Sequence, residues 1–230
     1  MQKGRWQVSP AVGALVVIAA TAYASAAHGS PTGALRSAGV DQTTPSPTAP
    51  VTPDTGQSPY TAADVQFMGG MISHHAQAVL MASWAPTHGA SGAVRRLCER
   101  ILVGQRDEIA FMQRWLGERH EAIPPADPRG HMMPGMDHPM LMPGMLTPEQ
   151  MAQLDSARGP QFDRSFLKFM IQHHRGAIAM VEQLLSTQGA AQDGLVFQFA
   201  SGVNADQTTE IDRMTRMLDA LSQTSQGSPR

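Results

Sequence analysis

Two His-His pairs stand in matching surroundings in this chain. The segment "MISHHAQAVLM" occupies residues 71–81, and "MIQHHRGAIAM" occupies residues 170–180. Each pair follows a methionine by three residues and precedes another methionine in the next two turns. Thioether sulfurs and neutral imidazole nitrogens suit soft metal ions such as Cu(I) and Ag(I). The candidate metal ligands from these segments are Met71, His74, His75, Met81, Met170, His173, His174 and Met180.

A second set of candidate ligands lies between the two segments, in "HMMPGMDHPMLMPGM" at residues 131–145. The stretch has neither a helical nor a strand period, so packing in a core does not explain its methionines. The tetrapeptide MPGM occurs twice, and Pro-Gly at its centre is typical of a type II turn, which brings its first and fourth Cα atoms within about 7 Å. Two thioethers of one turn could therefore share an ion, and His131 could add an imidazole nitrogen. The candidate ligands here are Met132, Met133, Met136, His138, Met140, Met142 and Met145. The alternatives are a low-complexity linker and a sink for methionine oxidation.

The elements that position these residues are predicted to be helices in an internal repeat. Asp64 and Phe67 precede the first His pair as Asp163 and Phe166 precede the second. A further match relates 97–116 to 199–218, where Gln-x-x-Glu-Ile-x-x-Met recurs. In both segments the matched positions step by three and four residues, which is one stripe of an α-helix. Each half is therefore predicted to be a helical hairpin.

The predicted fold class is all-α, a ferritin-like four-helix bundle of two repeated hairpins with a Met-rich central loop. Start signals support it, because Thr61 with Asp64 has the spacing of a capping box and Thr147 precedes Pro148. Pro86, Gly89 and Gly189 are stop signals. The expected domain covers residues 60–222, with repeat one at 61–117, the Met-rich loop at 128–147, repeat two at 160–222 and a tail at 223–230.

The inward stripes also contain Gln105, Glu108 and their counterparts, and they add Met112 and Met214 to the candidate ligands. Adjacent histidines on a helix point about 100° apart, so one of each pair at most can face the bundle axis. The alternative interpretation is structural, with histidines held in a His–Glu hydrogen-bond network and methionines filling gaps in the core.

The N-terminal residues predict export. Residues 1–27 carry Lys3 and Arg5 before an uncharged apolar run that ends in small residues, which is typical of a signal peptide. An uncleaved membrane anchor is the alternative, and it would be the chain's one contact with a membrane. Residues 28–59 are rich in Pro, Ser and Thr and predict a disordered linker. We expect an extracytoplasmic location, in the periplasm, at the cell surface or secreted.

Charge and cysteine content exclude other classes. The net charge of −2 and the scattered Lys and Arg form no basic face, so nucleic acid is not an expected partner. Cys98 is the sole cysteine, so no internal disulfide can form, and its place on an apolar stripe predicts a small buried side chain.

These motifs resemble the bacterial family of proteins called domain of unknown function 305. The resemblance covers residues 60–218, and it is carried by "DVQFMGGMISHHAQAVLMA", "QRDEIAFMQRWL", "DRSFLKFMIQHHRGAIAM" and "DQTTEIDRMTRML". It implies a ferritin-like bundle exported to the periplasm or cell surface. Some members are periplasmic copper-binding proteins implicated in copper tolerance, and the Met and His positions of the two His-His motifs correspond to that family's Met and His positions.

The expected function is therefore that of an exported copper-binding protein rather than an enzyme. Cu(I) is the favoured ion, with Ag(I) and Cu(II) as further candidates, and the role is metal tolerance, buffering or transfer to another copper-handling protein. One alternative is a ferritin-like di-metal oxidase, but such sites use Glu-x-x-His on two helices, and here the spacing is Gln105-x-x-Glu108. Another is a helical interaction module that binds no metal.

Overall fold

The computed structural model describes residues 60–131 and 140–226, and within them the chain is helical. It contains α1 (Ala62–Ser83), α2 (Gly92–Glu118), α3 (Pro148–Ser156), α4 (Gly159–Ser186) and α5 (Gly194–Gln226). The described residues include no β-strand, only an isolated bridge between His131 and Met140. The all-α prediction is confirmed, with a short fifth helix that the sequence interpretation did not include. At the C-terminal end, α5 continues past Ser222 to Gln226.

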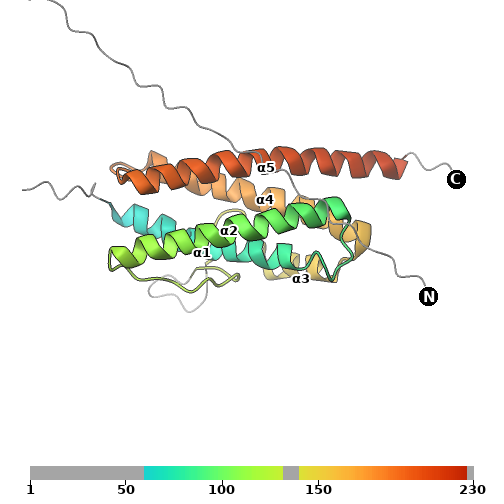
Figure 1. The fold of residues 1–230 in the computed structure, drawn as a ribbon, viewed down its shortest axis with the longest axis horizontal. Helices are drawn as coiled ribbons and strands as arrows, with labels where there is room; N and C mark the ends of the chain where they lie inside the picture. Colours follow the sequence, from blue (N-terminus) through green and yellow to red (C-terminus); the bar gives the residue numbers. More distant parts are fainter. Residues whose placement is uncertain (1–59, 132–139, 227–230) are drawn as a thin grey trace, which may run out of the picture. The chain divides into compact units, whose positions relative to one another are not determined.

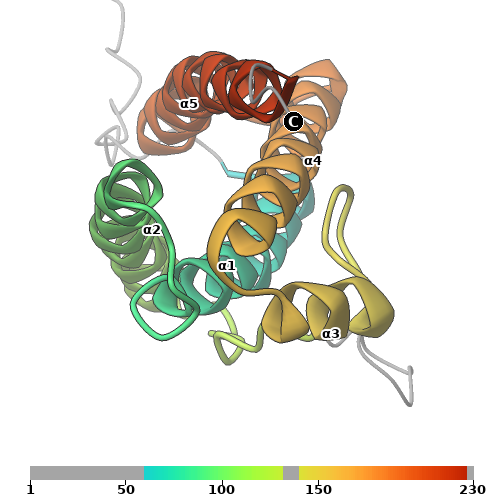
Figure 2. The same cartoon turned by 90° about the vertical axis from the view of Figure 1, so that its right-hand side faces the viewer.

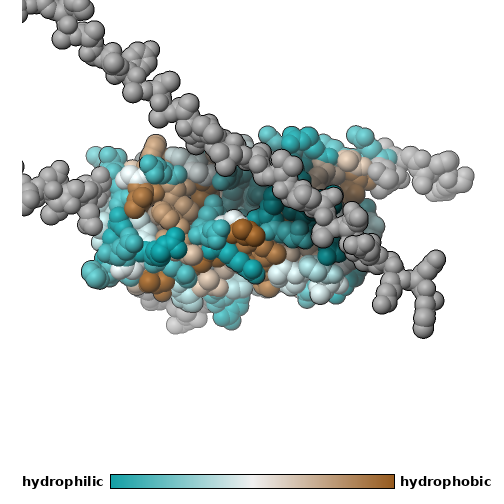
Figure 3. Space-filling view, viewed as in Figure 1, coloured by the Kyte–Doolittle hydropathy of each residue, from teal (hydrophilic) through white to brown (hydrophobic). Residues whose placement is uncertain are grey.

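The four long helices form two hairpins that meet along α1 and α4. Helix α1 packs on α2, α4 packs on α5, and α1 contacts α4, whereas α2 and α5 do not pack closely on each other (Figure 1, Figure 2). Helix α3 lies beside α4. On the face that carries α2 and α5, apolar residues are scattered among polar ones (Figure 3).

The helix ends follow the local signals in the sequence. Thr61 and Asp64 form a reciprocal capping box at the start of α1, and Thr147 with Gln150 forms another at the start of α3. The backbone then turns out of the helix at Ala157 and Arg158, both extended, before Gly159 with φ +54°. The two extended residues separate α3 from α4, and glycine tolerates the positive φ at the start of α4.

Each hairpin is tied to the other by a buried aspartate near the start of its first helix. Oδ1 of Asp64 accepts a hydrogen bond of 2.7 Å from the backbone N–H of Ala191, in the loop between α4 and α5. Its counterpart Asp163 accepts one of 3.1 Å from the N–H of Ser91, in the loop between α1 and α2. A hydrogen bond that a backbone N–H donates to a carboxylate is stronger than one between neutral groups, so these two aspartates fix the halves against each other.

The core has two hydrophobic clusters separated by a polar layer. One cluster includes Leu97, Phe166 and Met214, and the other includes Phe67, Trp115 and Val203. On each long helix, buried or partly buried polar side chains lie between the two clusters. We call this set the polar layer: His74, His75, Gln105, Glu108, His173, His174, Gln207 and Glu210.

The predicted signal peptide or anchor at 1–27 and the linker at 28–59 lie outside the described residues. Among the described residues, none of the helices has the length and apolar character needed to cross a membrane.

Candidate metal centre

The polar layer places all four histidines inside the protein, with no exposed side-chain surface. His74 and His173 meet where α1 crosses α4, with ring centroids 3.8 Å apart. His75 and His174 point instead toward the second helix of their own hairpin. The 100° between neighbouring side chains on a helix thus directs one histidine of each pair to the other hairpin and one to its own.

The central pair is held uncharged by burial. The pKa of His74 is lowered to about 3, mainly by burial and next by the neighbouring His75, while the Pro143 carbonyl opposes the shift. Burial also lowers the pKa of His173 well below its usual value, with His74 as the next cause. Nε2 of His74 lies 3.0 Å from the Pro143 carbonyl oxygen. Because a carbonyl oxygen only accepts, Nε2 carries the proton and donates the hydrogen bond. The imidazoles are therefore neutral, the form in which histidine binds metals.

Each outer histidine is paired with a glutamate. Nε2 of His174 donates a 2.6 Å hydrogen bond to Oε2 of Glu210. The matching His75 Nε2 lies 2.7 Å from Oε2 of Glu108, but the contact is poorly aligned for a hydrogen bond. Both pairs agree with the His–Glu network that the sequence left open as the structural alternative.

Several nitrogen and oxygen atoms of the layer have no hydrogen-bond partner among the described residues. They include Nδ1 and Nε2 of His173, Nδ1 of His174, and both side-chain amide atoms of Gln105 and Gln207. A buried polar group without a partner costs roughly 1–3 kcal/mol. The polar layer is therefore suited to binding a polar ligand.

The second MPGM forms the turn that its sequence predicts. The N–H of Met145 donates to the Met142 carbonyl at 3.1 Å, and Gly144 between them has φ +76°. The sulfur of Met145 accepts from the N–H of Met142 at 3.3 Å, so it is turned toward its own backbone.

This turn lies directly on α4. A Cβ atom built on Gly176 would stand 1.9 Å from the Pro143 carbonyl oxygen, so only glycine admits the loop here. Gln77 of α1 holds the flanking loop, because its side chain donates to the carbonyls of Pro128 and Leu146 and accepts from the Leu146 N–H. The loop is thereby fixed across α1 and α4, next to His74.

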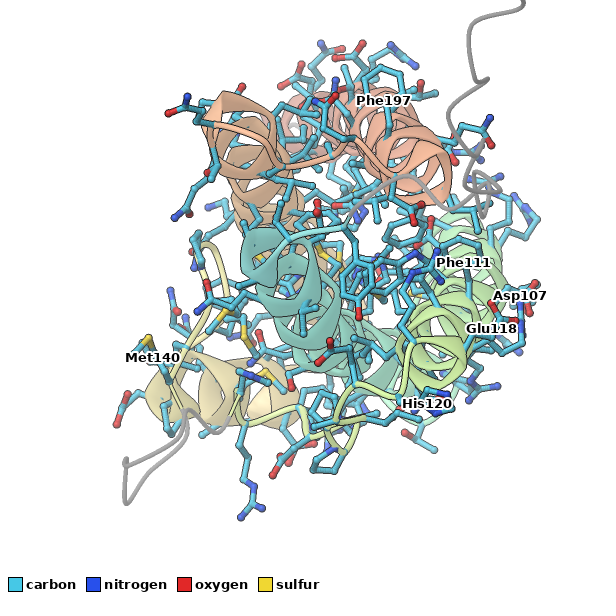
Figure 4. The ribbon with its side chains drawn as sticks, turned by 90° about the vertical axis from the view of Figure 1, so that its left-hand side faces the viewer. Asp107, Phe111, Glu118, His120, Met140 and Phe197 are labelled. Carbon is cyan, nitrogen blue, oxygen red and sulfur yellow. The ribbon has the colours of Figure 1, made fainter. Side chains whose placement is uncertain are left out.

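A cavity of about 360 Å³ opens beside the turn, and we call it the methionine pocket. Its lining includes His131, Met140, Met142 and Met180, which come from the loop and from α4. His131 and Met140 are joined backbone to backbone, N–H to carbonyl, at 3.0 and 2.8 Å. Met140 lies on the side of the domain away from α2, which carries Asp107 (Figure 4).

The pocket brings a neutral imidazole next to three thioethers. Burial lowers the pKa of His131, and its Nδ1 is buried without a hydrogen-bond partner among the described residues. The sulfur of Met142 passes close to α1, where a Cβ built on Gly70 would be 3.1 Å from it. Sulfur and neutral nitrogen are the donors that Cu(I) and Ag(I) prefer.

The other predicted methionine ligands divide between packing positions and undescribed positions. Met81, Met170 and Met214 belong to one hydrophobic cluster, and Met71 and Met112 belong to the other. Both clusters are apolar, so these five methionines fill the core in this structure. The remaining predicted ligands lie outside the described residues: Met132, Met133, Met136 and His138.

In the described part of the chain, no group of three or more His, Cys, Asp and Glu side chains is arranged to hold a metal ion. The layer's histidines are engaged with one another, with glutamates or with the loop. A soft ion such as Cu(I) or Ag(I), bound in this part of the chain, would therefore draw on methionine sulfur. This chemistry points to the methionine pocket rather than to the polar layer.

Sequence reasoning missed the residues that make room for the loop. The signal was present as the glycines within helical segments, "GG" at 69–70 and "RGA" at 175–177, since a glycine inside a helix often marks close approach of another segment. The sequence interpretation also treated His131 only as an additional nitrogen ligand for the loop, whereas the structure places it in the pocket with Met180.

Comparisons with known proteins agree with this fold. Residues 64–218 match the model of the family described as domain of unknown function (DUF305). The fold is similar to a DUF305 protein of Streptomyces coelicolor described as secreted, with 30% identity, a TM-score of 0.60, and coverage of 70% of this chain and 94% of that one. A DUF305 fragment from Deinococcus radiodurans is 28% identical, with a TM-score of 0.58 and coverage of 70% and 99%.

CopM, solved in a Cu(II)-bound form, shares the fold at 24% identity and a TM-score of 0.53, with coverage of 68% of this chain and 96% of CopM. Among curated proteins, the uncharacterized protein L153 of Acanthamoeba polyphaga mimivirus is 34% identical over 56 residues, which is 24% of this chain. The match spans 37% of the viral protein, little more than a third of its length.

Proposed function

Because the chain belongs to the DUF305 family, whose description gives no activity, we propose its function from its own side chains: it is an exported copper-binding protein. The ion is Cu(I) or the chemically similar Ag(I), with Cu(II) as a further candidate. The role is metal tolerance, buffering or transfer to another copper-handling protein.

The methionine pocket is the observation that carries the proposal. It combines Met140, Met142 and Met180 with the neutral imidazole of His131 around one cavity. Thioethers are soft, uncharged ligands that bind Cu(I) and Ag(I) and discriminate against Mg²⁺, Ca²⁺ and Mn²⁺. Without a bound ion, the three methionine sulfurs would line an open pocket, where thioethers oxidise readily.

The similar proteins support the proposal in class and location. CopM has been solved in Cu(II)-bound, Cu(I)-bound and Ag-bound forms. The Streptomyces coelicolor protein is described as secreted, in agreement with an extracytoplasmic location for this chain. The assignment of His and Met as ligands, and the preference for Cu(I), rest on the residues of this chain.

We propose a binding role rather than catalysis, on a ferritin-like four-helix bundle formed by α1, α2, α4 and α5. A di-metal oxidase would need Glu-x-x-His on two helices, and the corresponding spacing here is Gln105-x-x-Glu108. The third candidate, an interaction module that binds no metal, predicts that neither Cu(I) nor Ag(I) changes the stability of the protein.

The test is a Cu(I) titration against a competing chelator at pH 7 and pH 5.5, with Ag(I) in parallel. The double variant Met142→Leu with Met180→Leu keeps the apolar volume and removes two sulfurs, so we expect it to lose one tight equivalent. Met217→Leu, a partly buried methionine packed on the opposite cluster, is the matched control.

Binding to the pocket should persist at pH 5.5, because methionine needs no deprotonation, and burial lowers the pKa of His131, which favours its neutral imidazole. If the double variant binds as many ions as the control, with equal affinity, the pocket is not the site. If the wild-type protein binds neither ion more tightly than a methionine-free helical control, copper binding is refuted.

A further inference from the structure

A groove lined by polar residues lies between α2 and α5, separate from the methionine pocket. It has a volume of about 200 Å³ and is lined by Gln105, Glu108, Gln207 and Glu210, among others. At roughly 30 Å³ per water molecule, this space corresponds to about seven waters. A partly hydrated metal ion therefore fits in it.

The lining is related by the internal repeat. Gln105 and Glu108 stand one turn apart on α2, and Gln207 and Glu210 occupy the matched positions of α5. The groove thus presents the same pair of oxygen donors from both sides. Met142 and Met180, which line the methionine pocket, do not line this groove.

The two glutamines are the unusual feature. Gln105 is 4% exposed and Gln207 is 3% exposed, and neither side-chain amide has a hydrogen-bond partner among the described residues. An amide carbonyl has two lone pairs and can be turned by rotation of the side chain, so each glutamine can direct an oxygen into the groove. Two unpartnered amides facing one cavity point to a ligand that accepts oxygen donors.

Glu108 and Glu210 supply negative charge to the groove. In the ion pairs of the described residues, their partners are histidines rather than lysine or arginine. The glutamate side chains are 25% and 24% exposed, and each has Oε2 against a histidine Nε2, which leaves Oε1 free to face the groove. Arg100 also lines the groove, but no ion pair found among the described residues joins it to Glu108 or Glu210.

We propose that this groove binds a divalent cation through oxygen, using Glu108, Glu210 and the amide oxygens of Gln105 and Gln207, with water completing the shell. Carboxylate, carbonyl and water oxygens are the ligands of Ca²⁺, Mg²⁺ and Mn²⁺. Nε2 of His75 and Nε2 of His174 each contact Oε2 of the carboxylate in their own hairpin. The ion links the two hairpins on the side where α2 and α5 do not pack closely.

This proposal does not depend on copper binding, and the probe keeps the two apart. Mn²⁺ has little affinity for thioethers and gives a paramagnetic resonance signal that is lost when it binds. We expect the full chain, freed of metal, to bind one Mn²⁺ and to melt at a higher temperature with it. Ca²⁺ or Mg²⁺ should compete for the same ion site.

The variants Glu108→Gln and Glu210→Gln should each weaken Mn²⁺ binding by at least about tenfold, as removal of a metal's carboxylate partner does. Asp107→Asn and Asp212→Asn change the same charge at exposed positions of the same helices and should leave binding unchanged. Gln105→Leu separates ligand loss from misfolding, because removal of an unpartnered amide should maintain the stability of the metal-free protein while Mn²⁺ binding weakens.

Absence of saturable Mn²⁺ binding to the wild-type chain would overturn the proposal and leave a groove filled by water. Equal weakening in the Asp107 and Asp212 variants would overturn it as well, since that result indicates a diffuse charge effect. In either case the Ag(I) titration of the methionine pocket reports independently, so failure here is distinguishable from failure of the proposed function.

Discussion

Acid should destabilise the metal-free protein through its central histidines. His74 has a pKa of about 3 in the folded protein, and the pKa of His173 is also well below its usual value, whereas both titrate near 6.5 in the unfolded chain. Below pH 6.5 the unfolded state therefore binds more protons than the folded state. A histidine whose folded pKa is lowered contributes stability that is present above its unfolded pKa and declines as pH falls toward the folded pKa.

The size of the effect follows from that difference. His74 lowers the free energy of unfolding by about 1.4 kcal/mol per pH unit in this window, which amounts to about 2 kcal/mol at pH 5. Because the pKa of His173 is also lowered, it removes further stability with the same sign, and the total is a substantial part of the roughly 5–15 kcal/mol typical of a domain. His131, whose pKa burial also lowers, adds a smaller contribution of the same sign.

The assay is urea denaturation, followed by circular dichroism, at intervals between pH 7 and pH 5 in the presence of a chelator. His173→Leu removes one of the two groups, so the slope of unfolding free energy against pH should become smaller. His120→Asn is the control, because His120 is exposed and its φ of 57° is one that asparagine tolerates. A wild-type stability that does not change from pH 6.5 to 5, or a slope that His173→Leu leaves unaltered, would refute the reasoning.

Two further predictions concern single positions. Gly176→Ala should destabilise the protein by about 1–3 kcal/mol and weaken Ag(I) binding, because the new Cβ would stand 1.9 Å from the Pro143 carbonyl oxygen. Gly202→Ala should stabilise the protein by about 0.5–1 kcal/mol, because a Cβ there has nothing within 4 Å. Thermal melts of both variants check the opposite signs, and stabilisation of both would mean that the loop does not rest on α4. Cys98 is buried and burial raises the pKa of its thiol to about 12, so a thiol reagent at pH 8 should modify it only after denaturant is added. Rapid labelling of the native protein would contradict the described packing.

The helices and the turn could be predicted because their signals are local. Thr61 with Asp64 defines the start of α1, and Pro-Gly in the second MPGM defines the turn. The internal repeat then predicted that two hairpins have matching residues inside. All of this depends on spacing along the chain, which sequence displays directly.

The site could be predicted only in part, because it depends on contacts between distant segments. The sequence identified both His-His pairs but could not tell that His74 meets His173 while His75 turns to Glu108. Position in the stripe also did not separate Met180, which lines the pocket, from Met81, which packs in the core. The two methionines differ because the loop crosses α4 at Gly176. This glycine occupies the position in the second half that Gln77 occupies in the first half.

The two aspartate contacts have the symmetry of a dimer. Asp64 of the first hairpin reaches the loop of the second, and Asp163 of the second reaches the loop of the first, so the same contact is made twice in exchanged directions. In oligomers such reciprocity is the mark of an isologous, twofold interface. In a chain reduced to a single hairpin, the same loop contact would have to come from a second copy of the chain, whereas the link between the repeats makes the pairing independent of concentration.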